Sequence, residues 1–291
     1  MTALTDPDVP AWIDGLGIPG LYDVHVHFMP PRIMDRVWEH FESRGPLIGR
    51  EWPITYKSPV EERVETLRAL GVRRFSALPY AHKPGIATYL NDWARAFAAE
   101  TPDSLRSATF FPEESAAGYV GDLIAEGVEI FKVHVQVGDF DPRDPLLDEV
   151  WGQLAEAETP VVVHAGSGPV PNAHTGPGPV ADVLGRHPRL TAVIAHMGAP
   201  EYAEFLSLAE SYERVFLDTT MAFTDFFEEL AAYPPALLPR LEALQDKILL
   251  GSDFPNIPYG YAHQLESLER LDLGESWLRK VCWENAARLI G

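Results

Sequence analysis

The strongest constraint on the fold is the alternation of short apolar strands with helical segments along most of the 291-residue chain. Runs rich in Val, Ile and Phe follow segments in which apolar residues recur at helical spacing, with no break in composition. This alternation is typical of a parallel sheet covered by helices. The expected strands are Tyr22–His27, Val72–Tyr80, Leu105–Phe111, Glu129–Val137, Pro160–Ala165, Leu190–His196, Val215–Thr219 and Lys247–Ser252.

Eight strand–helix units in roughly 250 residues match a closed (β/α)8 barrel, or TIM barrel. We expect a single α/β barrel domain over residues 1–291, completed by two or three further helices between Tyr259 and Ile290. A doubly wound open sheet is the alternative, but it gives no reason for histidines at the ends of distant strands.

The first strand carries an unusual polar face. Asp23, His25 and His27 alternate with Tyr22 and apolar residues, so the three polar side chains share one side of the strand. Such groups are costly to bury unless something satisfies them. A metal ion would satisfy them, and so would hydrogen bonds within the core. Residues 22–27 alone leave both interpretations open.

Polar residues at the ends of the other strands favour the metal. Barrel active sites form at the carboxyl ends of the strands. Of the ten histidines, His25 and His27 end the first strand, His164 the fifth and His196 the sixth, and Asp253 follows the eighth. Histidines scattered through a core would not choose the same end each time, so the sequence predicts a metal site there.

The motifs at these strand ends resemble the amidohydrolase superfamily, specifically the amidohydrolase-2 branch that includes aminocarboxymuconate-semialdehyde decarboxylase. The resemblance covers the whole chain and implies one metal ion, usually zinc, held by His25, His27, His164 and Asp253. It also implies that His196 lies beside the metal as an acid/base or electrophile. The motifs that carry it are Asp23-Val-His25-Val-His27, Val-Val-Val-His164-Ala-Gly, Ile194-Ala-His196-Met-Gly, Leu-Gly251-Ser-Asp253-Phe-Pro and Glu284-Asn285-Ala286.

Elementary chemistry agrees with that ligand set. Three imidazoles and a carboxylate suit Zn²⁺ and leave a position open for water or substrate, although Mn²⁺ or Fe²⁺ accept the same ligands. The metal lowers the pKa of its water toward ~7. We expect Asp253 and His196 to be catalytic, the first as a proton acceptor and the second by polarising a carbonyl group.

The fourth strand carries a second alternating set, Lys132, His134 and Gln136. Binuclear relatives place a carboxylated lysine on this strand to bridge two metals, which is one possible role for Lys132. We favour a buried lysine paired with an acid, with Asp23 as the candidate partner, and therefore a single metal ion. His134 and Gln136 are then expected to contact the substrate or a metal-bound water.

Three further residues complete the predicted site. His174 lies in a loop rich in Pro and Gly after the fifth strand, and Asn256 follows Asp253, so both are candidate substrate contacts. Asp218 ends the seventh strand, where it is expected to hydrogen-bond a metal ligand.

Composition limits the partners. A net charge of −20 opposes binding to nucleic acid or to an anionic membrane. No apolar run approaches the ~18 residues that a membrane span needs. The single cysteine, Cys282, and an N-terminus without signal-peptide features favour a cytoplasmic protein. We expect a small-molecule substrate, and a homo-oligomer is compatible with the sequence.

The leading functional hypothesis is a metal-dependent hydrolase that attacks a small amide, lactone or ester through metal-bound water. The alternative is a nonoxidative decarboxylase of a small unsaturated or aromatic carboxylate. A catalytically silent barrel with structural zinc would need a closed ligand set. A phosphoesterase would need more metals and more basic residues. The fold cannot choose between hydrolysis and decarboxylation.

Overall fold

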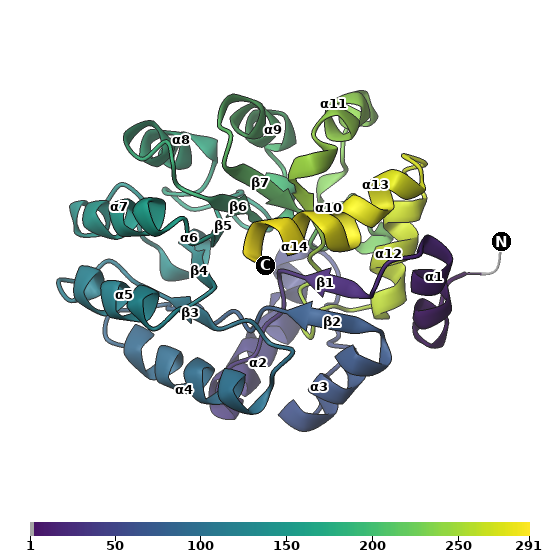
Figure 1. Cartoon of the computed structure of the whole chain (residues 1–291), viewed down its shortest axis with the longest axis horizontal. Helices are drawn as coiled ribbons and strands as arrows, with labels where there is room; N and C mark the ends of the chain where they lie inside the picture. The colour runs from purple at the N-terminus through teal and green to yellow at the C-terminus, as the bar shows by residue number, and fades with distance from the viewer. Residues whose placement is uncertain (1–2) are drawn as a thin grey trace.

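The protein is a ring of parallel strands surrounded by helices (Figure 1). The computed structural model describes residues 3–291, apart from the side chains of residues 44–47. Strand β1 pairs with β2, and β3 to β8 form one sheet in chain order, with every pairing parallel. The strands are β1 (Leu21–Asp23), β2 (Val72–Phe75), β3 (Ser107–Thr109), β4 (Ile130–His134), β5 (Val161–His164), β6 (Ala192–Ile194), β7 (Val215–Asp218) and β8 (Ile248–Leu249).

Backbone hydrogen bonds close both gaps between the two sheets. Between β2 and β3, the Leu105 amide donates to the Phe75 carbonyl at 2.7 Å. Between β8 and β1, the Val24 amide donates to the Leu250 carbonyl at 2.9 Å. The predicted (β/α)8 barrel is therefore confirmed.

Helices cover the outside of the barrel after each strand (Figure 1). Short helices α1 and α10, and the single turn α6, were not expected, whereas the predicted C-terminal helices are present. No helix among the described residues is long and apolar enough to cross a membrane. The helices are α1 (Val9–Leu16), α2 (Pro31–Ile48), α3 (Val60–Ala69), α4 (Ala87–Glu100), α5 (Ala116–Ala125), α6 (Val135–Gly138), α7 (Asp148–Ala157), α8 (Pro177–Arg186), α9 (Tyr202–Ser211), α10 (Asp225–Ala231), α11 (Leu238–Ala243), α12 (Tyr261–Glu269), α13 (Glu275–Arg279) and α14 (Asn285–Ile290).

All eight strands end earlier than predicted, and at β1 and β4 this takes predicted site residues off the strand. β1 stops at Asp23, so His25 and His27 lie on the segment that follows it. β4 stops at His134, because the His134 ring accepts a hydrogen bond from the Val137 amide at 3.3 Å and caps the turn α6. Gln136 therefore lies on a helical turn rather than on a strand face.

The barrel interior is apolar at one end and polar at the other. Tyr22, Ile130 and Val162 belong to one buried cluster that also contains Ala286 of α14, with Trp283 packed against it. In Figure 1, α14 lies across the middle of the ring. Lys132 and His164 follow Ile130 and Val162 by two residues, so they share the inward face and lie nearer the carboxyl ends of β4 and β5.

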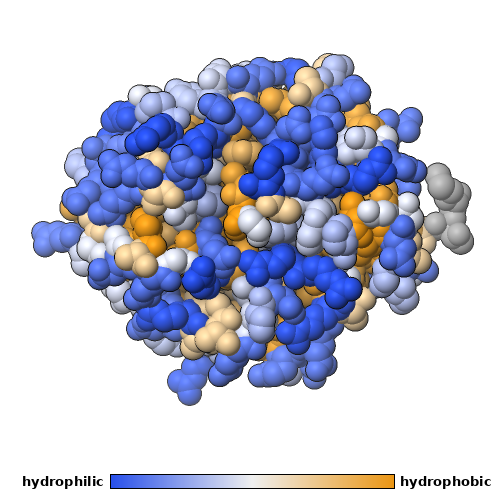
Figure 2. All heavy atoms as spheres, in the orientation of Figure 1, coloured by the Kyte–Doolittle hydropathy of each residue, from blue (hydrophilic) through white to orange (hydrophobic). Residues whose placement is uncertain are grey.

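The surface matches the acidic composition. Figure 2 shows a mostly hydrophilic face over the side that α14 covers, with hydrophobic residues in separate small groups.

The core lies between the strands and the surrounding helices. Trp151 of α7 is an example, because its indole donates to the Pro142 carbonyl at 2.9 Å and packs edge-on against Phe110.

Candidate functional site

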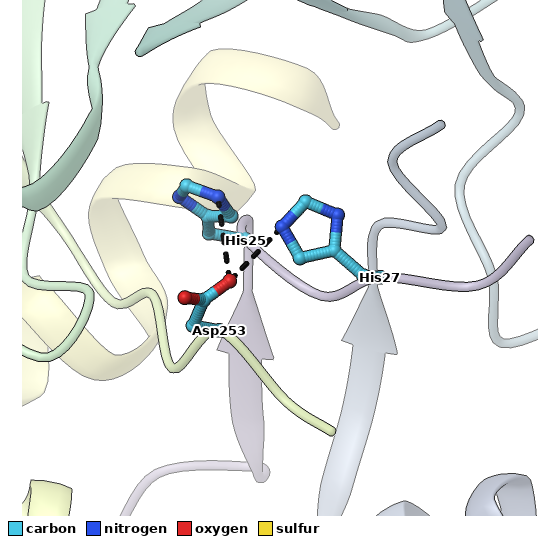
Figure 3. Close-up of side chains that lie close together, drawn as sticks. All are labelled: His25, His27 and Asp253. Carbon is cyan, nitrogen blue, oxygen red and sulfur yellow. Dashed lines mark ion pairs between the residues drawn. The ribbon is translucent and has the colours of Figure 1, made fainter. Parts of the chain in front are cut away.

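Three predicted metal ligands meet at the carboxyl ends of β1 and β8 (Figure 3). The ligand atoms of His25, His27 and Asp253 all lie within 4.8 Å of one another, and all three side chains are buried. Asp253 Oδ1 is 3.0 Å from His27 Nε2 and 4.0 Å from His25 Nε2. We refer to these three residues as the ligand group.

Hydrogen bonds fix the rings of His25 and His27 so that each ring directs its Nε2 toward Asp253. His25 Nδ1 lies 2.8 Å from an oxygen of Asp218, and His27 Nδ1 lies 2.8 Å from the Leu78 carbonyl oxygen. Both partners are acceptors, so each Nδ1 carries the proton and each Nε2 keeps its lone pair. A buried carboxylate with two such imidazoles is a donor set that a divalent cation fits.

Two buried carboxylates hold this arrangement in place. Asp218 accepts from the His196 amide at 2.9 Å through its second oxygen, as well as binding His25. Asp23 accepts from the His25 amide at 3.1 Å and from the Tyr261 hydroxyl at 2.8 Å. Burial raises the pKa of Asp23 to about 7. The sequence predicted a hydrogen bond with Asp218 and left hydrogen bonds within the core open for Asp23, but it did not indicate Tyr261, which lies far along the chain.

The expected pairing of Lys132 with Asp23 is wrong. Lys132 is fully buried, and its Nζ lies 3.0 Å from His25 Nε2. Burial lowers the pKa of Lys132 to about 8, against the opposing effect of Asp218 and Asp253. Inward alternation along β4 brings the lysine to the ligand group, while Asp23 is satisfied by backbone amides and a tyrosine.

His164 lies in the same buried region, outside the three-residue group. Its ring stacks on that of His134, with centroids 3.9 Å apart, and its Nε2 is 3.2 Å from the Gly168 carbonyl oxygen. Burial, followed by the charge of Lys132, lowers the pKa of His164 to about 3, so the ring is neutral at pH 7. Its assignment as a fourth ligand stays a prediction.

His196 lies beside the ligand group, with its ring centroid 5.3 Å from that of His25. Its Nδ1 is 3.0 Å from the Thr220 carbonyl oxygen and therefore carries the proton. Burial holds the pKa of His196 well below its usual range, so the ring is neutral and Nε2 is unprotonated. This state fits the acid/base half of the expected role better than the electrophilic half.

The ligand group opens into a cavity of about 660 Å³. Three predicted substrate contacts line it, namely His134, Gln136 and Asn256, although the Gln136 amide already donates to the Val170 carbonyl. His174 is outside the lining formed by the described residues, and its Nδ1 is 3.9 Å from Asp141.

Tyr80 is the cavity residue whose chemistry the sequence left undetermined. Its ring meets those of His27 and His134 at centroid distances of 5.4 and 5.3 Å. The hydroxyl makes no hydrogen bond with a described residue, and burial together with Asp253 raises the pKa of Tyr80. A phenol that stays protonated is a hydrogen-bond donor. The position of Tyr80 at the end of the second expected strand was the sequence signal that could have indicated this role.

We expect Asp218→Ala to weaken metal binding about 10- to 100-fold, because it frees the ring of His25 and the backbone of His196. Competition of the purified variant with a chelator measures this affinity. Asp182→Asn, at an exposed position on α8, is the matched control and should bind metal like the parent chain. Equal affinities in the two variants would contradict the positioning role of Asp218.

Comparisons with known proteins agree with this geometry. The family model for amidohydrolases (Amidohydro_2) matches residues 22–291. No curated protein matches the chain significantly.

Solved structures with less than 25% sequence identity share the fold. A TIM-barrel protein from Bordetella bronchiseptica is 20% identical with a TM-score of 0.74, covering 92% of this chain and 98% of its own. A 5-carboxyvanillate decarboxylase from Novosphingobium aromaticivorans with bound manganese is 14% identical with a TM-score of 0.62, covering 94% and 98%. A probable 2-pyrone-4,6-dicarboxylic acid hydrolase from Acinetobacter baumannii is 14% identical with a TM-score of 0.59, covering 94% and 100%. With a family match over nearly its whole length, the chain belongs to the amidohydrolase-2 family.

Proposed function

We propose that the protein is a mononuclear metal-dependent hydrolase that cleaves a small amide, lactone or ester. The observation that carries this proposal is the convergence of His25, His27 and Asp253 within 4.8 Å at the floor of a cavity. Both imidazoles keep Nε2 unprotonated, and the carboxylate is available as ligand and proton acceptor.

The ligand group would hold the metal ion, with His164 as the proposed fourth ligand. Such an ion supplies Lewis acidity, which polarises a carbonyl group and lowers the pKa of a bound water toward about 7. We propose Zn²⁺ because imidazole and carboxylate suit it, while the manganese in a structurally similar decarboxylase makes Mn²⁺ the alternative.

The chain offers proton acceptors and donors on different sides of the cavity floor. Asp253 and the Nε2 of His196 are the proposed proton acceptors, because His196 Nδ1 donates to the Thr220 carbonyl and leaves Nε2 unprotonated. Tyr80 donates, because its phenol is protonated and unpartnered. A water attacking a carbonyl needs an acceptor for its proton and a donor for the developing oxyanion, and these residues supply both.

Hydrolysis fits this inventory better than decarboxylation. This preference rests on Asp253 and on the Nε2 of His196, which can accept a proton from an attacking water. The substrate, a small molecule, and the cytoplasmic location expected from the sequence stay proposals.

Purified protein is expected to contain one divalent metal ion per chain, measured by elemental analysis. His27→Ala should lose most of it, because two ligand atoms then remain without the third. His263→Ala, which alters a histidine on α12 outside the cavity lining, is the control and should keep its metal. Two tightly bound equivalents would contradict the mononuclear assignment and favour a carboxylated Lys132.

The reaction itself is tested by isotopes. Hydrolysis in ¹⁸O-labelled water places the label in the carboxylate product, because the oxygen that enters comes from water. Decarboxylation in D₂O instead releases CO₂ and puts deuterium on carbon. A screen of lactones, amides and aromatic carboxylates with the metal-loaded protein, followed by mass spectrometry, separates the two. CO₂ release without ¹⁸O incorporation would overturn the proposed hydrolysis.

We expect Tyr80→Phe to lower kcat about 10²-fold while leaving metal content unchanged, because it removes one hydrogen-bond donor to the oxyanion. Steady-state kinetics and metal analysis of the same preparation measure both quantities. Tyr89→Phe, at an exposed position on α4, should match the parent. An unchanged kcat in Tyr80→Phe would assign that ring to packing alone.

A further inference from the structure

Away from the ligand group, the cavity wall is apolar. Helix α2 supplies Ile33, Val37 and Phe41, and Trp52 follows from the next segment. Phe41 and Trp52 pack with ring centroids 4.8 Å apart, and the Trp52 indole donates to the Asn256 carbonyl at 2.7 Å. This wall is therefore fixed to the segment that carries Asp253.

Further apolar side chains line the cavity beside His196 and on the segments that follow β4 and β5. The Phe227 ring lies parallel to that of His196, with centroids 6.0 Å apart and planes at 14°. Val137 and Val170 line the facing side, and Val137 is 39% exposed. Large apolar side chains that line an accessible cavity leave water to be displaced by an apolar ligand.

Charges around the cavity oppose an anionic tail on the substrate. Of the lysines and arginines that line it, Lys132 lies at the floor with its Nζ 3.0 Å from His25 Nε2, and Arg36 is 80% exposed and paired with Glu39 at 2.9 Å. Asp139 adds an exposed carboxylate to the lining. The chain as a whole carries a net charge of −20, which repels anions at long range.

We propose that the substrate is a neutral carbonyl compound with an extended apolar body, such as an alkyl or aryl chain, and no second carboxylate. The carbonyl group lies over the ligand group, and the apolar body lies along Val37, Phe41 and Trp52. This inference rests on the proposed hydrolase function and specifies its substrate class. A volume of about 660 Å³ accommodates a chain of this kind.

Binding is measured with a matched pair of probes, octanamide and suberamic acid, which differ by exchange of the terminal methyl group for a carboxylate. Isothermal titration calorimetry of the metal-loaded protein should give at least about tenfold tighter binding of octanamide. Within the series from butanamide to octanamide, each added methylene should tighten binding about fourfold. Equal or tighter binding of suberamic acid would overturn the proposal.

Variants on α2 locate the binding surface. Val37→Asp should weaken octanamide binding at least about tenfold, because it places a charge in the apolar wall. Val37→Lys should shift preference toward suberamic acid. Ser43→Asp adds the same charge at an exposed position of α2 outside the cavity lining and should change neither Kd. Identical effects of Val37→Asp and Ser43→Asp would contradict the assigned wall, and thermal unfolding checks that each variant is folded.

Turnover of phenyl octanoate and monophenyl suberate separates the two proposals. Hydrolysis of the neutral ester at higher kcat/KM supports both. Hydrolysis of the anionic ester alone overturns the substrate class and leaves the hydrolase function standing. Tighter binding of octanamide than of suberamic acid, with no hydrolysis of amides, lactones or esters, overturns the hydrolase function. The same result leaves the apolar ligand class supported.

Discussion

Closure of the barrel between β8 and β1 is the constraint on which the site depends. The two strands come from opposite ends of the chain, and backbone hydrogen bonds continue beyond both of them. The Asp253 amide donates to the His25 carbonyl at 2.9 Å, and the His27 amide donates to the Phe254 carbonyl at 2.7 Å. Because this ladder fixes the register of the two segments, the three ligand side chains cannot separate without breaking it. The geometry of the ligand group is thus a property of the closed sheet.

Burial then determines the charge state of the site. His25, His134, His164 and His196 all have pKa values lowered chiefly by burial, with neighbouring histidines and Lys132 adding to the effect. The lowered values keep the imidazoles neutral, which is the form that binds a metal or accepts a proton. The negative charge of Asp218 raises the pKa of His164, His196 and Lys132. The proposed metal binding and proton transfer therefore depend on the same compact set of buried charges.

The sequence predicted those parts of the molecule that follow from local pattern. Short apolar runs between helical segments located all eight strands, and the choice of one strand end located His25, His27 and Asp253. Strand ends were less predictable, because β4 stops where the His134 ring caps a turn. The partner of Lys132 was beyond reach for a different reason. Both Asp23 and His25 lie on the same face of the first segment, and only the three-dimensional register decides which one the lysine meets.

Backbone conformation shows that the site draws stability from the rest of the barrel. Asp253 and His196 have positive φ angles of 71° and 54°, a conformation that costs side-chain-bearing residues about 1–3 kcal/mol each. Gly198 has a φ of 76°, and a Cβ there would lie 2.1 Å from Phe205, so this turn also needs a residue without a side chain. Hydrogen bonds from the His196 amide to Asp218 and from the Asp253 amide to His25 hold both residues in place. The first bond joins the ends of the neighbouring strands β6 and β7, and the second crosses the closure between β8 and β1, so both conformations depend on the assembled barrel.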